Sequence, residues 1–289
     1  MKIGITLKHN AYTPEAYAYQ QYLVGYGYDV QLDFNLDNNN DINIYFMGLR
    51  PFWSNKNGKA FEIHEYQSLS TPPYSYAKNK LKRIINKKPV GRIFLNNDVK
   101  KCFSFNDNIP YIKRDMGVDE ILFQKPKLNP DFDILYSGSV SGRVGLIENL
   151  VKLAKNYKLI VVGQVEGIEK EYLTNKNITL TGRVNRHELP EIYSNVRYGL
   201  NYTPDLYPFN IQTSTKTLEY LAAGLGVISN RYQWIEKFCD KLNYKPIWLE
   251  DLNETEINLI NNNLPDMSEY SWNNILKNSK FENFIKGFK

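Results

Sequence analysis

The chain has 289 residues, of which 42% are hydrophobic, so it is long enough to form about two domains with buried cores. Its net charge of +5 is uneven, because residues 1–118 carry +6 and residues 119–289 carry −1. The basic first part is therefore expected to face something anionic. No apolar run reaches the roughly 18 residues of a membrane-spanning helix, which excludes that class.

The cysteine and histidine content argues against disulfide and metal sites. Cys102 and Cys239 lie far apart with no C-x-x-C, which is typical of reduced thiols in a cytosolic protein. None of the three histidines has metal-ligand spacing. Residues 2–7 predict a first strand and not a secretory signal. We therefore expect a cytoplasmic protein that needs no metal and no other cofactor.

Strands and helices alternate along the whole chain, which favours α/β domains with parallel sheets. In the first part, strands are predicted at 2–7, 28–34, 42–47, 60–66, 90–95 and 110–113, and helices at 14–25, 76–88 and 98–103. In the second part, strands are predicted at 133–139, 158–162, 178–181, 198–202 and 227–229, and helices at 146–155, 188–194, 214–222 and 234–240. The prolines and lysines of residues 126–130 predict a linker, so the domains are expected to be 1–118 and 119–270.

The helix that begins near Ser214 carries the most informative side chains. Ser214 and Thr215 are favoured helix N-cap residues, and Lys216 and Glu219 lie in the first two turns. Unpaired N–H groups and the helix dipole attract an anion there. A hydroxyl and an ammonium suit a diphosphate, whereas a carboxylate one turn further suits the vicinal hydroxyls of a ribose. The alternative is a solvated Lys–Glu pair worth a few tenths of a kcal/mol.

The pattern Ser-x-Lys-x-x-Glu-Tyr-Leu-Ala-x-Gly-x-x-Val-Ile resembles the donor-site helix of GT-B glycosyltransferases of the nucleotide-sugar-dependent group-1 type. This resemblance implies that Glu219 holds the ribose and that Ser214 and Lys216 approach the diphosphate. It also implies a GT-B fold, with two Rossmann-like parallel-sheet domains facing a cleft. Residues 115–119 and Phe123 resemble the family's inter-domain turn. Residues 270–275 resemble its closing helix, so residues 271–289 are expected to pack back across the interface.

Other donor-site candidates follow strands, where ligands of open α/β sheets bind. Gly138 and Ser139 would let the backbone approach a phosphate and Arg143 would neutralise it, although Arg143 could also be a surface residue. The spacing matches neither G-x-G-x-x-G nor a P-loop, which argues against an NAD enzyme and a P-loop nucleotidase. The resemblance further implies a loop beside the sugar and base and a second loop that reads the base edge. These loops contain Gly163 and Gln164, and Arg183 and Val184, respectively.

The chain departs from the resemblance at one position. Classical retaining members carry Glu-x7-Glu, and the residue eight before Glu219 is Ile211. Asp205, Asn210 or Gln212 could do a related job. The sugar and the stereochemical outcome therefore stay open.

Candidates for the acceptor side follow strands of the first domain. His9 comes after the first strand, and His64 and Glu65 are expected at the end of the fourth. Any of them, or Asp107, could be the general base of an inverting enzyme, whereas a retaining enzyme needs none in that role. A loop histidine or glutamate is otherwise solvated or caps a backbone group.

The helix predicted at 76–88 is strongly basic, and Phe52 and Trp53 lie in a neighbouring loop. One interpretation is an ordinary solvated helix. The other, which we favour, is peripheral contact with an anionic membrane, where each nearby Lys or Arg adds about 1 kcal/mol. Nucleic acid is not an expected partner, because no nucleic-acid motif occurs.

The sequence thus predicts a metal-independent glycosyltransferase of the hexosyltransferase type. Its donor would be a nucleotide diphosphate sugar, UDP-linked by our prediction. Its acceptor would be a glycan or lipid-linked molecule in bacterial surface polysaccharide synthesis. The alternatives are a GT-B nucleotide-sugar epimerase and a non-catalytic nucleotide-sugar-binding partner.

Overall fold

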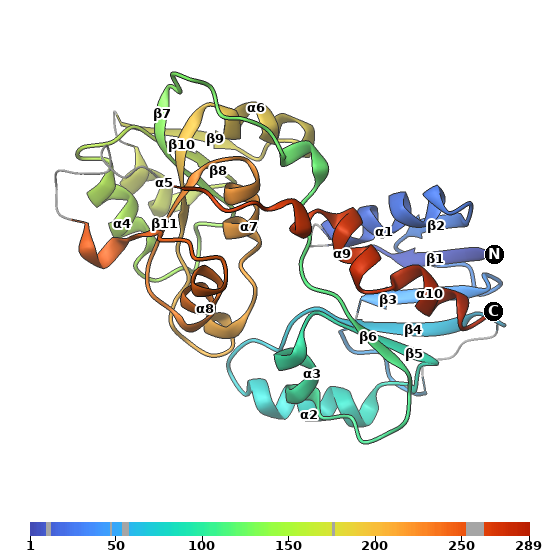
Figure 1. Cartoon of the computed structure of the whole chain (residues 1–289). Coiled ribbons are helices and arrows are strands. Elements are labelled where there is room, and N and C mark those ends of the chain that lie inside the picture. Colours follow the sequence, from blue (N-terminus) through green and yellow to red (C-terminus); the bar gives the residue numbers. More distant parts are fainter. Residues whose placement is uncertain (10–12, 47, 54–57, 175–176, 253–262) are drawn as a thin grey trace. The chain divides into compact units, whose positions relative to one another are not determined.

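The computed structural model describes residues 1–9, 13–46, 48–53, 58–174, 177–252 and 263–289. The chain forms two compact units (Figure 1). Unit 1 comprises Met1–Gly117 and Glu269–Lys289, and unit 2 comprises Val118–Ser268. Each unit contains one six-stranded sheet, all of whose pairings are parallel. The α/β class predicted from the alternating pattern is confirmed.

The sheet of unit 1 has the strand order β2-β1-β3-β4-β5-β6. Its strands are β1 (Lys2–Thr6), β2 (Asp29–Asp33), β3 (Ile42–Phe46), β4 (Phe61–Tyr66), β5 (Gly91–Phe94) and β6 (Tyr111–Lys113). Its helices are α1 (Pro14–Gly25), α2 (Ser75–Ile85), α3 (Asn97–Phe103), α9 (Trp272–Asn278) and α10 (Phe281–Lys286).

The two C-terminal helices complete the core of unit 1. In Figure 1 the red helices α9 and α10 lie beside the blue helix α1, and Trp272 and Phe281 belong to the same buried cluster as Ile3 and Ile44. A Cβ on Gly117 would lie 2.4 Å from the Trp272 ring, so only glycine fits there. The structure therefore groups residues 269–289 with unit 1. The expected packing across an inter-domain interface stays a prediction.

A buried ion pair ties several of these elements together. Arg114, directly after β6, pairs with Glu65 of β4, and both side chains are fully buried. Arg114 Nε also donates to the Tyr19 hydroxyl of α1 at 2.6 Å, and its guanidinium lies 5.2 Å from the Trp272 ring centroid. Buried charges are tolerated only when they are paired and hydrogen-bonded. This cluster therefore fixes how β4, α1 and α9 pack.

The sheet of unit 2 has the strand order β12-β11-β10-β7-β8-β9. Its strands are β7 (Phe132–Ser137), β8 (Leu159–Val162), β9 (Ile178–Gly182), β10 (Val196–Asn201), β11 (Gly226–Ser229) and β12 (Ile247–Trp248). Its helices are α4 (Leu146–Leu153), α5 (Gly167–Leu173), α6 (Leu189–Ser194), α7 (Thr215–Ala222) and α8 (Gln233–Lys241). The sequence did not predict α5 or β12, which are short. Short 3₁₀ turns are η1 (Glu120–Leu122), η2 (Arg186–Glu188), η3 (Phe209–Ile211), η4 (Leu249–Asp251) and η6 (Ser268–Tyr270), the last of which begins with the final residue of unit 2 and ends in unit 1.

We expect Trp272→Ala to lower the free energy of unfolding by about 3–5 kcal/mol, because it empties a buried aromatic site beside Arg114. Trp53→Ala is the matched control, since the Trp53 side chain is 63% exposed and Trp272 only 4%. Trp53→Ala should change the free energy of unfolding by less than about 0.5 kcal/mol. Urea unfolding followed by circular dichroism measures both. Equal effects of the two substitutions would contradict the packing described for α9.

Candidate functional site

The centre of the unit 2 sheet is its topological switch point. β7 and β10 are neighbours there, and strands later than β7 continue to one side while strands later than β10 continue to the other. In open parallel sheets ligands bind outside the carboxyl ends of the strands at this point. β7 ends at Ser137 and Gly138 follows it, and β10 ends at Asn201. The candidate residues Gly138, Ser139 and Arg143 all follow β7.

Helix α7 begins beside these strand ends and is held there by side chains. Ser214 caps the helix, as predicted, because its Oγ accepts a hydrogen bond from the Thr217 N–H at 3.3 Å. The Ser214 hydroxyl donates to Asn201 Oδ1 at 2.8 Å, and Asn201 Nδ2 donates to the hydroxyls of Ser229 and Tyr232 at 3.0 and 2.9 Å. Thr215 is the first helical residue. The unpaired N–H groups of the first turn are therefore fixed at the switch point.

Lys216 lies against the glycine that follows β7. A Cβ on Gly138 would lie 2.9 Å from Lys216 Cε and 3.1 Å from Nζ, and Gly138 has φ +125°. Both the backbone conformation and the close approach of the lysine thus require glycine. Lys216 Nζ also lies 5.0 Å from the Tyr136 ring centroid. Burial, reinforced by the neighbouring charge of Arg143, lowers the pKa of Lys216 to about 7.

Arg143 supplies a second cation near the same strand end. Its Nη1 donates to the Tyr202 backbone oxygen at 3.2 Å, which directs the side chain toward the segment after β10. Among the described residues, no carboxylate lies within ion-pair distance of Arg143 or Lys216. Two cations without anionic partners beside a helix N-terminus form a chemically suitable site for a diphosphate.

Glu219 lies one turn further along α7 and is buried. Its Oε2 accepts a hydrogen bond from the Tyr193 hydroxyl at 3.3 Å, and its Oε1 lies 3.5 Å from Arg186 Nη1. Burial raises the pKa of Glu219, and the charge of Arg186 opposes that rise. Each carboxylate oxygen keeps a lone pair that could accept from a ligand hydroxyl.

The loops after β8 and β9 approach the same edge. Gly163 has φ +144°, and its N–H donates to the Gly182 carbonyl oxygen at 2.9 Å. A Cβ on Gly163 would lie 2.4 Å from the Gly138 carbonyl oxygen, so these loops meet backbone to backbone. Gln164 is exposed and its side chain donates to Glu166. Ser139 and Arg183 are also exposed, and Val184 is half-buried. Their proposed ligand contacts stay predictions.

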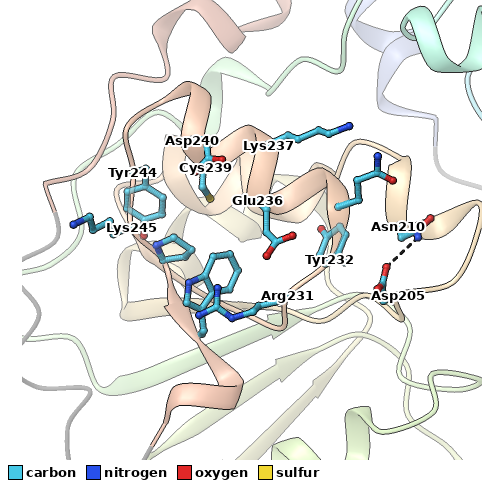
Figure 2. A pocket seen from close by; sticks show the side chains of 13 residues that line it. Asp205, Asn210, Arg231, Tyr232, Glu236, Lys237, Cys239, Asp240, Tyr244 and Lys245 are labelled. Carbon is cyan, nitrogen blue, oxygen red and sulfur yellow. Dashed lines mark hydrogen bonds between the residues drawn. The ribbon is translucent and has the colours of Figure 1, made fainter.

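The segment around Ile211, where the resemblance would place a glutamate, contains a polar pair. Asn210 Nδ2 donates to Asp205 Oδ1 at 3.0 Å, next to Ile211 in η3. Figure 2 shows this pair at one side of a pocket of about 1080 Å³, which α8 and Trp248 also line. Neither Lys216 nor Glu219 lines that pocket.

The structure changes the interpretation of His64 and Glu65. Both were expected at the end of the fourth strand, and both lie in β4, where neighbouring side chains point to opposite faces. The Glu65 carboxylate is engaged by Arg114. His64 is fully buried, its Nε2 lies 3.4 Å from Glu62 Oε2, and burial lowers its pKa. Neither side chain reaches solvent, so we give neither a catalytic role.

Two other candidates for a general base differ in the partners of their side chains. Asp107 receives two hydrogen bonds from Arg92, at 2.6 and 2.8 Å, which lower the pKa of its carboxyl and make it a weak base. His9 is exposed after β1, and its ring stacks on Phe34 with the centroids 4.2 Å apart. Asp107 is exposed as well, but its ion pair with Arg92 makes it the weaker base, so His9 is the candidate that we keep. Its role stays a prediction.

Sequence reasoning missed three residues that shape the site: Arg186, Tyr193 and Asn201. Asn201 had a usable signal, because a polar residue that ends a buried strand at the carboxyl edge lies where ligands bind. Arg186 lies three positions after Arg183, close to the loop that was expected to read the base edge. Tyr193 had no signal, because a tyrosine on a helix is usually a packing residue.

Neither a metal cluster nor a membrane-spanning helix is found in the described part of the chain. Among these residues, no three His, Cys, Asp or Glu side chains gather to hold an ion. No described helix has the length and apolar character needed to span a bilayer. Metal independence stays a prediction.

Comparisons with known proteins agree with this architecture. Residues 143–244 match a protein family described as glycosyl transferase-like. No curated protein matches the sequence.

Several solved structures resemble the chain at low sequence identity. AviGT4, a glycosyltransferase involved in avilamycin A biosynthesis, has a TM-score of 0.59 and 11% identity, covering 99% of this chain and 96% of AviGT4. WaaG, a glycosyltransferase involved in lipopolysaccharide biosynthesis, has a TM-score of 0.58 and 11% identity, covering 99% of this chain and 92% of WaaG. HepE of Anabaena, in complex with UDP-glucose, has a TM-score of 0.54 and 11% identity, covering 82% of each chain.

The GT-B fold that the resemblance of the donor-site helix implied is thereby confirmed. The chain has the GT-B fold of the glycosyltransferases it resembles, and its residues 143–244 match the glycosyl transferase-like family.

Proposed function

We propose that this protein is a glycosyltransferase that binds a nucleotide diphosphate sugar in unit 2 and transfers the sugar to an acceptor. The start of α7 carries this proposal. It brings helix N–H groups, the cation of Lys216 and the carboxylate of Glu219 to the switch point of a parallel sheet. The match of residues 143–244 to a glycosyl transferase-like family supports it.

In the proposed reaction the bond between the sugar's anomeric carbon and the diphosphate breaks, and negative charge develops on the leaving diphosphate. Lys216, Arg143 and the N–H groups of α7 would stabilise that charge without a metal. These groups would already be in place before the bond breaks, so little reorganisation of the protein would be needed during the reaction. Glu219 would accept hydrogen bonds from the ribose hydroxyls. We propose a UDP-linked donor, because HepE, which shares the fold, is described in complex with UDP-glucose.

The acceptor is proposed to be a glycan or lipid-linked molecule of a bacterial surface polysaccharide. WaaG, which has the same fold, is described as acting in lipopolysaccharide biosynthesis. A general base is required only if the reaction inverts the anomeric centre, and His9 is then our candidate. The configuration of the product, determined by NMR, decides between the two stereochemical courses.

We further propose that an exposed apolar surface on unit 1 contacts a membrane, which would suit a lipid-linked acceptor. Seven of the described apolar side chains are exposed on or near the basic helix α2, and we call them the aromatic face: Leu49, Phe52, Trp53, Tyr74, Tyr76, Leu81 and Ile84. The Phe52 N–H donates to the Ile85 carbonyl oxygen at 2.9 Å, so the loop and the helix end form one surface. Aromatic side chains surrounded by lysines suit the headgroup region of anionic lipids.

Activity can be tested by incubating the protein with UDP-glucose or a GDP-sugar, with and without lipid-linked and soluble glycans. We expect nucleotide release that increases with an acceptor and persists when a chelator is present. Interconversion of the sugar without an acceptor would establish an epimerase instead. Binding without turnover under every condition would establish a non-catalytic partner.

Glu219→Ala should weaken UDP binding by about 1.5–3 kcal/mol, because the ribose loses charged hydrogen bonds. Glu171→Ala is the control, since Glu171 is exposed on α5 of the same unit. Isothermal titration calorimetry measures both. Unchanged affinity for UDP in Glu219→Ala would remove the ribose-binding role.

The affinity for UDP-glucose should depend on pH through Lys216. With a pKa of about 7 in the free protein, the ammonium is present below that value and is lost as pH rises through it. A bound diphosphate favours the charged form, so affinity should be highest below about pH 7 and fall by up to about tenfold per pH unit above it. Lys216→Arg should flatten this profile, because arginine stays charged. A pH dependence that Lys216→Arg leaves intact would contradict the assignment.

The aromatic face should bind vesicles that contain phosphatidylglycerol and not vesicles of phosphatidylcholine alone. Substituting Trp53 and Phe52 by serine should reduce co-sedimentation, because apolar insertion is lost. Tyr172→Ser is the control, since Tyr172 is equally exposed but lies in unit 2. Raising the salt concentration should weaken binding. Equal binding to both vesicle types would contradict an electrostatic membrane contact.

A further inference from the structure

Arg186 bridges two carboxylates that are far apart in the sequence. Its Nε donates to Asp119 Oδ2 at 2.8 Å, and its Nη1 lies 3.5 Å from Glu219 Oε1. All three residues belong to unit 2. Their side chains are 19%, 30% and 12% exposed for Arg186, Asp119 and Glu219, so the partly enclosed guanidinium is shielded from most solvent screening. One cation is thus shared between two acidic groups, of which Glu219 is the more buried.

Arg186 and its partner Asp119 are each held in place by a 3₁₀ turn. Asn185 and Glu188 form a capping box around η2, and the Asn185 N–H donates to Glu188 Oε2 at 2.7 Å. Asp119 caps η1, since its Oδ1 accepts from the Ile121 N–H at 3.3 Å. The guanidinium is therefore anchored on Asp119, its shorter contact, and extends from there to Glu219.

We propose that Arg186 is a positioning residue for the donor: anchored on Asp119, it holds the Glu219 carboxylate in the orientation that accepts the ribose hydroxyls. This inference rests on the proposed function, in which Glu219 binds the ribose. In this role Arg186 acts through Glu219 and needs no contact with the donor itself. A second anchor for the same carboxylate is the Tyr193 hydroxyl, at 3.3 Å from Oε2.

The charges around Glu219 give this role a measurable pH dependence. The facing groups are Arg186 from η2, Tyr193 from α6, and Lys216 and Tyr220 from α7. Burial raises the pKa of Glu219, and Arg186 is the largest opposing influence. Removing Arg186 should therefore raise the pKa of Glu219 further. A protonated carboxyl is a weaker acceptor for hydroxyls, so ribose binding would be retained above that pKa and lost as pH falls through it.

The test compares UDP with 2′,3′-dideoxy-UDP, which has the same base and diphosphate but no ribose hydroxyls. Calorimetric titrations of wild type and Arg186→Gln would cover about pH 5.5 to 8.5, a range in which a raised glutamate pKa becomes visible. We expect Arg186→Gln to weaken UDP binding about tenfold, with a larger loss at the acidic end. Binding of the dideoxy analogue should be the same in both proteins. Both ligands carry the same diphosphate, so proton binding to that diphosphate changes both affinities equally and cancels when the two are compared.

Matched variants separate positioning from folding. Arg186→Lys keeps the charge and should recover part of the UDP affinity and flatten the pH profile. Asp119→Asn keeps Arg186 but weakens its anchor, and should cause a smaller loss that is also confined to UDP. It replaces Arg186→Gln if that variant does not fold. Arg197→Gln removes another arginine–aspartate pair of unit 2, at 3.6 Å from Asp133, and should leave UDP binding unchanged.

Two results would overturn the inference while leaving the proposed function intact. One is wild-type UDP affinity in Arg186→Gln at every pH. The other is an equal loss for UDP and the dideoxy analogue, which would show general damage to the site. Failure of the wild-type protein to bind UDP would refute the UDP donor as well, and this inference with it.

Discussion

The amide of Asn201 is the contact on which the arrangement of the donor site depends. Asn201 is the last residue of β10 and is paired in register with Ser229, the last residue of β11. Its oxygen accepts from Ser214 and its nitrogen donates to Ser229 and Tyr232. Both ends of one buried side chain thus join two strand ends to the start of a helix. Because every polar atom of that amide is used, the helix N-terminus is held in place before any ligand arrives.

Two glycines let side chains of α7 come close to the strands. Gly138 leaves room for the Lys216 side chain, and Gly199 leaves room for the Tyr220 ring, which a Cβ would approach to 2.1 Å. The Tyr220 hydroxyl in turn accepts from the Ser137 N–H at 3.0 Å. The packing that supports α7 therefore also desolvates Lys216. The lowered pKa of Lys216 is a direct consequence of how closely the helix approaches β7.

Unit 1 uses its buried charges for packing. Glu65 pairs with Arg114 on one face of β4, while Glu62 on the other face receives hydrogen bonds from Arg50 at 2.9 and 3.0 Å. Side chains of the strand alternate between faces, so His64 and Glu65 cannot act on one substrate together. Exposed groups of unit 1 that can meet a ligand lie instead in loops, as His9 does, and on the aromatic face beside α2.

Local pattern determined much of this protein. Alternating apolar runs predicted both parallel sheets, and Ser214, Lys216 and Glu219 marked the important helix, because capping and helix dipoles depend on residues close together in the sequence. Tertiary structure alone decided which charges face one another. Arg186 meets Asp119 and Glu219, and Glu65 meets Arg114, only after distant segments pack. Local sequence does not predict such long-range pairs, because the same charged residue types occur where a side chain faces solvent and where it faces a buried partner.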